Sequence, residues 1–81
     1  MKTIEIRLTT LEDVRNFVNT VTKYDIDIDL SSGRYVVDAK SIMGLFSLDL
    51  TRPLDLKIYS EDEDEINQII ATLDDYNYIV K

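Results

Sequence analysis

The sequence contains no cysteine and no histidine among its 81 residues. Without cysteine there is no disulfide, and without either residue type the common zinc sites and the Cys-His and Ser-His-Asp catalytic groups are excluded. One proline and two glycines leave little room for long loops or linkers. We therefore expect one domain over residues 1–81 that is not an enzyme and holds neither a cofactor nor a metal.

Long apolar runs are also missing from the chain. No run approaches the ~20 residues that cross a bilayer, and the first residues lack the apolar segment of a signal peptide. The expectation is a cytoplasmic protein that does not enter a membrane. The 16 acidic and 9 basic side chains give a net charge of −7. Because an acidic protein repels phosphate, we do not expect nucleic acid as a partner.

The apolar residues that are present follow two periods. Alternation predicts strands over residues 3–8, 25–30, 34–39 and 54–58. Helical spacing predicts a helix over residues 11–23, a short helix after residue 41, and a last helix that opens within residues 60–65. The element order is then β-α-β-β-α-β-α. Each strand has one apolar and one polar face, so we expect a single sheet with helices on one side.

The predicted helices begin at polar residues that can accept backbone hydrogen bonds. Thr9 and Glu12 fit a capping box for the first helix, whose apolar face is expected to start at Leu11. Ser41 is a good N-cap for the short helix. Two alternatives remain open for the last helix: Ser60 with Glu63, or Asp62 with Glu65.

The second predicted strand alternates three aspartates with apolar residues, a spacing that also begins an EF-hand loop: Asp25, Asp27 and Asp29. The later positions of that loop do not match, since Leu30 replaces its glycine and Val36 its last carboxylate. We therefore interpret the aspartates as a solvated sheet face, with Lys57 and Arg7 as their expected cross-strand partners.

The short helix is apolar on more than one side. Leu45 and Leu48 can point into the core, which leaves Ile42, Met43 and Phe46 on another face. Methionine and aromatic side chains suit adaptable docking surfaces, so these three residues are predicted to bind a protein partner. The alternative is that the apolar C-terminal tail covers them.

The segment Ala-Lys-Ser-Ile-Met-Gly-Leu at residues 39–45, with Leu48, resembles the regulatory serine region of HPr, the phosphocarrier of the bacterial sugar phosphotransferase system. Phe17-Val18 and Tyr24 resemble the family's first helix at the same separation. The resemblance implies an α+β fold, the HPr open-faced β-sandwich with four antiparallel strands and three helices on one face. It also implies that Ser41 occupies the position that an ATP-dependent kinase phosphorylates in relatives.

The same resemblance identifies three departures from the family pattern. Thr10 stands at the position of the catalytic histidine, Glu12 at that of the arginine, and Asp13 at that of the proline. A phosphoramidate needs an imidazole nitrogen, and a threonine hydroxyl is a weak nucleophile without an adjacent base. The chain is therefore expected to be a divergent family member without phosphocarrier activity of the usual kind.

Three functions follow from these observations. In the first, an HPr-like regulatory module of the phosphotransferase system or of carbon-catabolite regulation docks partners through Lys40, Ile42, Met43 and Phe46 and is switched at Ser41. The expected partner is an HPr-type serine kinase or a transcriptional regulator. In the second, a small interaction domain keeps the fold but has unrelated partners. In the third, the chain is a phosphocarrier that forms a stable ester at Thr10.

Overall fold

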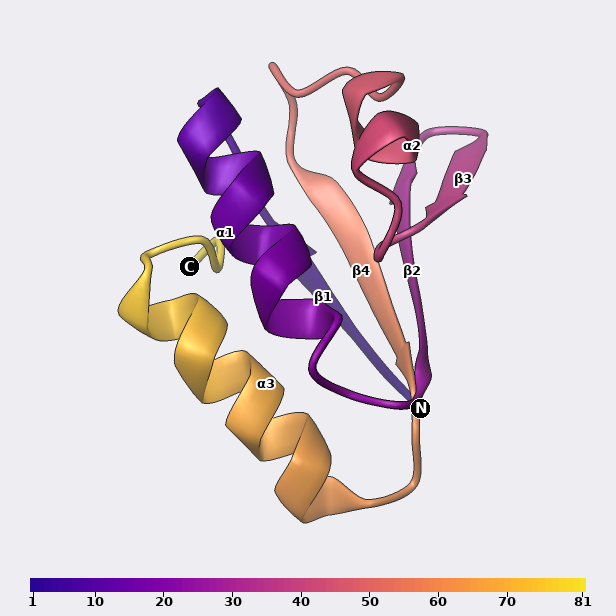
Figure 1. Ribbon diagram of the computed structural model, residues 1–81, viewed down its shortest axis with the longest axis vertical. Helices are drawn as coiled ribbons and strands as arrows, with labels where there is room; N and C mark the ends of the chain where they lie inside the picture. The colour runs from indigo at the N-terminus through magenta and orange to yellow at the C-terminus, as the bar shows by residue number, and fades with distance from the viewer.

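The computed structural model describes residues 1–81 and has the α+β architecture expected from the sequence (Figure 1). The predicted element order is confirmed. No helix is both long enough and apolar enough to span a bilayer. The elements are β1 (Lys2–Ile6), α1 (Leu11–Val21), β2 (Asp27–Ser32), β3 (Tyr35–Asp38), α2 (Ile42–Phe46), β4 (Leu54–Tyr59) and α3 (Glu63–Asp75).

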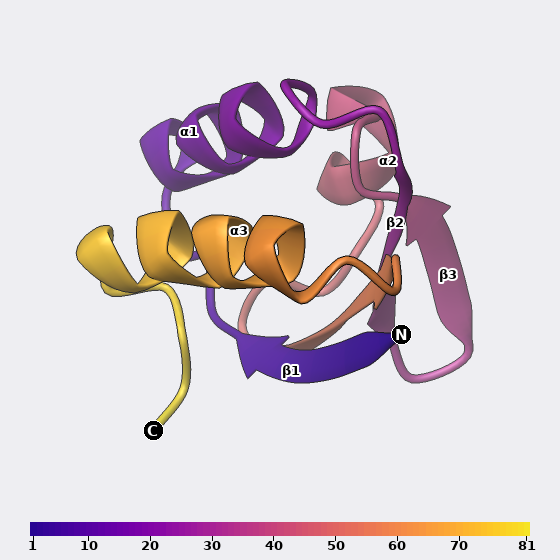
Figure 2. The same cartoon turned by 90° about the horizontal axis from the view of Figure 1, so that it is seen from below.

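The four strands form one antiparallel sheet in the order β1-β4-β2-β3. All three helices cover the same face of this sheet, as Figure 2 shows from below, and the opposite face is open. The central strand β4 displays the alternation that produces the two faces. Its residues Leu54, Leu56 and Ile58 are fully buried under the helices, whereas the residues between them are exposed.

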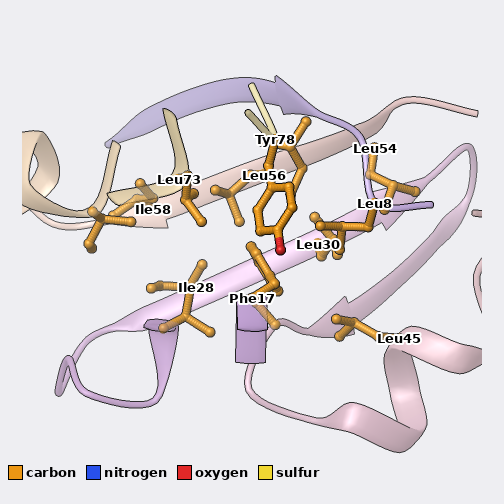
Figure 3. Packing of buried hydrophobic residues seen from close by; sticks show 14 of the residues in the cluster. Leu8, Phe17, Ile28, Leu30, Leu45, Leu54, Leu56, Ile58, Leu73 and Tyr78 are labelled. Atoms are coloured by element: carbon orange, nitrogen blue, oxygen red, sulfur yellow. The ribbon is translucent and has the colours of Figure 1, made fainter. Parts of the chain in front are cut away.

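The core is a single cluster of 17 buried side chains contributed by every element except β3 and by the C-terminal tail. Figure 3 shows Phe17 from α1 and Tyr78 from the tail among the aliphatic side chains of β2 and β4. Leu45 joins this cluster from α2, so even the five-residue helix is held by a buried side chain.

The C-terminal tail packs against β1. The Arg7 amide donates to the Tyr78 carbonyl at 2.7 Å, and the Val80 amide donates to the Glu5 carbonyl at 3.0 Å. A β-bridge between Ile6 and Ile79 lies between these two bonds. The tail therefore covers the β1 edge of the sheet, and the alternative that it covers the apolar face of α2 is wrong.

The start of α1 differs from the sequence prediction. The capping box is formed by Thr10 and Asp13, not by Thr9 and Glu12. Thr9 also donates to the Asp13 carboxylate through its amide and its hydroxyl, both at 3.0 Å. The helix ends at Val21 instead of residue 23, and Leu11 is 55% exposed, so the buried stripe begins one turn later.

Other boundaries and contacts were also settled by the structure. Asp62 caps α3, which resolves the two alternatives for that helix. The hairpin between β2 and β3 turns at Gly33, whose φ of +60° suits glycine, and at Arg34. Strand β2 therefore ends two residues after its predicted end at residue 30, and β3 begins one residue after its predicted start at residue 34. Lys57 lies opposite Asp29 as expected. Arg7 instead donates to the Thr51 carbonyl at 3.4 Å, because it follows the end of β1.

Candidate functional site

The N-terminus of α1 carries Thr10, the residue at the position expected for a catalytic group. Its hydroxyl accepts a hydrogen bond from the Asp13 amide at 3.0 Å, as an N-cap does. In return, the Asp13 carboxylate accepts from the Thr10 amide at 3.1 Å, in addition to both donors of Thr9. The backbone donors in front of this helix are therefore satisfied by a carboxylate from the helix itself.

The Asp13 carboxylate carries its negative charge at neutral pH. Partial burial raises the pKa of Asp13, but the hydrogen bonds from Thr9 and Thr10 outweigh this effect and hold its pKa below the ordinary value. Glu12 adds a second acidic side chain to the same helical turn. A phosphoryl group on Thr10 would lie beside this negative charge, which opposes the stabilisation that amides at a helix start give to an anion.

The C-terminal tail also contacts α1. The Asn16 side-chain amide donates to the Tyr78 hydroxyl at 3.3 Å. Burial raises the pKa of Tyr78, and the nearby Asp13 charge acts in the same direction. Tyr78 therefore stays a neutral phenol that links the tail to α1.

The N-terminus of α2 carries Ser41, which is exposed and has extended backbone angles. Its hydroxyl accepts from the Gly44 amide at 3.2 Å, and the first turn of α2 contains no acidic residue. Gly44 faces strand β3: a Cβ atom there would lie 3.2 Å from Cβ of Val37. Glycine therefore allows α2 to lie close to β3 while Ser41 remains at the surface.

The remaining apolar residues of α2 form a surface that we call the α2 surface, made of Ile42, Met43 and Phe46. Met43 is 76% exposed and Phe46 is 45% exposed, whereas Ile42 is half-buried against the core. Leu45 and Leu48 point inward as predicted and anchor the segment. Two large apolar side chains are thus held at the surface by a buried leucine on the opposite side of one short helix.

Lys40 lies beside this surface in the sequence, but its charge is directed elsewhere. Its ammonium group donates to the Tyr24 carbonyl at 2.6 Å and is half-buried. This contact ties the segment before α2 to the segment after α1. Sequence reasoning missed it because the two residues are 16 positions apart and share no periodic pattern.

The open face of the sheet carries the aspartates of β2. Asp29 lies opposite Lys57 on one side and Asp38 on the other. The Asp29 carboxylate, with a smaller effect from Asp27, raises the pKa of Tyr59 on the same face. No group of three or more acidic side chains is arranged so that it could hold a metal ion.

A comparison with protein families gives a match over residues 13–76 to the family described as "PTS HPr component phosphorylation site". The chain belongs to the HPr family. The matched region includes Ser41 and the α2 surface but begins three residues after Thr10. Membership in the HPr family therefore rests on residues 13–76, which contain Ser41 and the α2 surface but not Thr10.

Solved HPr structures have the same fold. HPr-C-His from Thermoanaerobacter tengcongensis is 28% identical, with a TM-score of 0.73 and 90% of each chain covered. The phosphocarrier protein HPr from Bacillus anthracis is 23% identical, with a TM-score of 0.65, and the match covers 88% of this chain and 92% of that one. The open-faced β-sandwich expected from the sequence resemblance is thereby confirmed.

Proposed function

We propose that this HPr-family chain is a regulatory protein-binding module and neither a phosphoryl carrier nor an enzyme. The observation that carries the proposal is the α2 surface, where Met43 and Phe46 are exposed on a helix anchored by the buried Leu45. Exposed methionine and aromatic side chains on a fixed element provide contact area that a partner can cover with little ordering cost.

The residues at the N-terminus of α1 support the proposal that this chain does not transfer phosphoryl groups. The chain contains no histidine, so no imidazole nitrogen is present to form a phosphoramidate. The Thr10 hydroxyl is engaged as a helix cap, and the carboxylate beside it, Asp13, is a weak base because its pKa is held below the ordinary value. The Asp13 carboxylate accepts from the Thr9 and Thr10 amides and places a negative charge beside the Thr10 hydroxyl, which opposes a phosphoryl group there. We infer that this member has diverged from the carrier role.

Ser41 is the proposed switch of the module. It is exposed and precedes the α2 surface directly. The sequence resemblance also implies that it occupies the position of the family's regulatory serine. A phosphate there would add about −1.5 to −2 charge units beside Ile42 and Met43. The added charge would change the affinity of any partner that covers this apolar surface. The partners that fit this role are an HPr-type serine kinase and a transcriptional regulator of carbon catabolism.

The test compares two aromatic residues of similar exposure on opposite faces of the molecule. Phe46 on α2 is 45% exposed and Tyr59 on the open sheet face is 43% exposed. Binding of each purified candidate partner is measured by titration calorimetry for the wild type, Phe46→Asp and Tyr59→Asp. We expect Phe46→Asp to weaken binding at least about tenfold, and Tyr59→Asp to leave it unchanged.

The folding of each variant is checked by circular dichroism, and Met43→Asp provides a second variant at the more exposed position. Equal effects of the Phe46 and Tyr59 substitutions would contradict docking through α2. If the wild type binds neither candidate partner, the proposed role in carbon catabolism is wrong.

A further inference from the structure

The two edges of the sheet are finished differently. The β1 edge is covered by the tail, which forms backbone bonds to Glu5 and Arg7. The β3 edge has no such cover: Tyr35 is 72% exposed and Val36 is 61% exposed, and no segment pairs with β3 on its outer side. An uncovered edge strand with exposed β-branched and aromatic residues is a template for pairing with another strand.

The hydrogen bonds between β2 and β3 show which residues of β3 have amide and carbonyl groups free to pair with another strand. The Ala39 amide donates to the Ile28 carbonyl, so odd-numbered residues at this strand direct their backbone groups toward β2. Because the direction alternates along an antiparallel ladder, Val36 directs its amide and carbonyl outward. Asp38 shares this phase, and its side chain lies on the open face with that of Val36. Arg34 belongs to the turn that precedes β3, two residues before Val36.

We propose that β3 pairs antiparallel with β3 of a second copy of this chain, with Val36 opposite Val36 of the partner subunit. In this register Arg34 lies opposite Asp38 of the partner subunit, and the two-fold symmetry repeats this pair. On the helical face, Tyr35 lies opposite Val37 of the partner subunit. The result is an eight-stranded sheet with the helices of both copies on one side.

Charge complementarity selects the partner and the register. Arg34 forms no ion pair within its own chain, and Asp38 is exposed, with one carboxylate oxygen accepting from the Lys40 amide at 2.9 Å. Shifting the strands by two residues in one direction places Arg34 opposite valine, and shifting them in the other direction places Asp38 opposite valine. Only the proposed register places Arg34 of each copy opposite Asp38 of the partner subunit and also lets the outward backbone groups of the two strands pair.

The association is expected to be weak. The edge strand has only four residues, so the buried area lies at the low end of protein interfaces. Each copy also carries a net charge of −7, which opposes association outside the local Arg–Asp pairs. The dimer should therefore appear at high protein concentration.

Sedimentation equilibrium of the full chain up to about 1 mM tests the proposal. The wild type should form a concentration-dependent dimer. Arg34→Asp and Asp38→Arg should each weaken dimerisation at least about tenfold, because each places like charges opposite one another. An equimolar mixture of the two variants should recover association as a heterodimer, since opposite charges then face each other at both positions.

The matched control is Asp55→Arg, the same substitution on the open face of the central strand β4, which should leave dimerisation unchanged. Arg34→Asp removes no side-chain hydrogen bond or ion pair within the chain, so its effect does not depend on the local bond of Asp38 to Lys40. A wild type that stays monomeric at about 1 mM would overturn the proposal. So would a dimer that persists in both single variants or a mixture that fails to associate.

Discussion

The helices α1 and α2 begin with the same local device and end with opposite properties. In each, a hydroxyl oxygen accepts from the third helical amide: Thr10 from Asp13 at 3.0 Å, and Ser41 from Gly44 at 3.2 Å. At α1 the third residue returns a carboxylate to the cap, whereas at α2 the third residue is glycine. A shared cap therefore does not give a shared capacity for an anion, because the residue at the third position decides whether a negative charge is already present.

The two helices also differ in how many of their side chains are buried. The 11 residues of α1 bury a full stripe that includes Val14, Phe17 and Val21. The five residues of α2 bury only Leu45. Most of the short helix is therefore surface, and its apolar side chains are left available to a partner.

The largest expected contrast between the two helices is in phosphoryl transfer. Incubation with phosphoenolpyruvate and Enzyme I should label an authentic histidine-containing HPr fully and this chain not at all, because Thr10 is a weak nucleophile facing the Asp13 carboxylate. The measurement is acid-labile and acid-stable radiolabel on the purified protein. A stable ester at Thr10 would instead support the carrier function.

The next contrast concerns the serine of α2. Incubation with an HPr-type serine kinase and ATP should add one phosphate, detected by intact mass, because Ser41 is exposed and its helix start has no acidic residue. Ser41→Ala should abolish the modification, and Thr10→Ala should leave it unchanged. An unmodified wild type would remove the switch from the proposed function without affecting the docking surface.

The smallest expected effect is on stability at α1. Asp13→Ala should lower the free energy of unfolding by about 1–2 kcal/mol at pH 7, because it leaves the Thr9 and Thr10 donors without their acceptor. The folded pKa of Asp13 is below its ordinary value of 3.8. This contribution is therefore fully present above about pH 4 and is lost as the pH falls through the folded pKa.

Denaturant titrations at several pH values measure this difference, and Asp13→Asn, which keeps one oxygen acceptor, should retain part of it. A gap between the wild type and Asp13→Ala that stays constant down to pH 2 would contradict the role assigned to the carboxylate.

The sequence was sufficient for elements whose pattern is local. Alternation in β4 assigned the buried side to Leu54, Leu56 and Ile58, and the cap at Ser41 was predicted at the correct residue. The separation of Leu45 from Met43 and Phe46 was also predicted, since helical spacing alone places them on different sides. The α2 surface could therefore be proposed before its exposure was known.

The capping box of α1 was predicted wrongly because the local sequence pattern supports two boxes equally well. Thr9 and Thr10 are adjacent hydroxyl residues, and each is followed three positions later by an acid, so the sequence allowed either capping box. The Asp13 carboxylate reaches the donors of both threonines, which favours the later start. Lys40 contacts Tyr24 and the tail contacts β1, and neither contact has a periodic signal.

The period of each element, the side that it buries and the absence of an imidazole follow directly from the amino-acid sequence, because these properties depend on residues close together in the chain or on composition. The packing of the folded chain was needed to establish which sheet edge the tail covers and that β3 remains open. Both outcomes depend on backbone groups that are the same in every residue, so their partners are selected by the packing of distant segments and not by side-chain pattern.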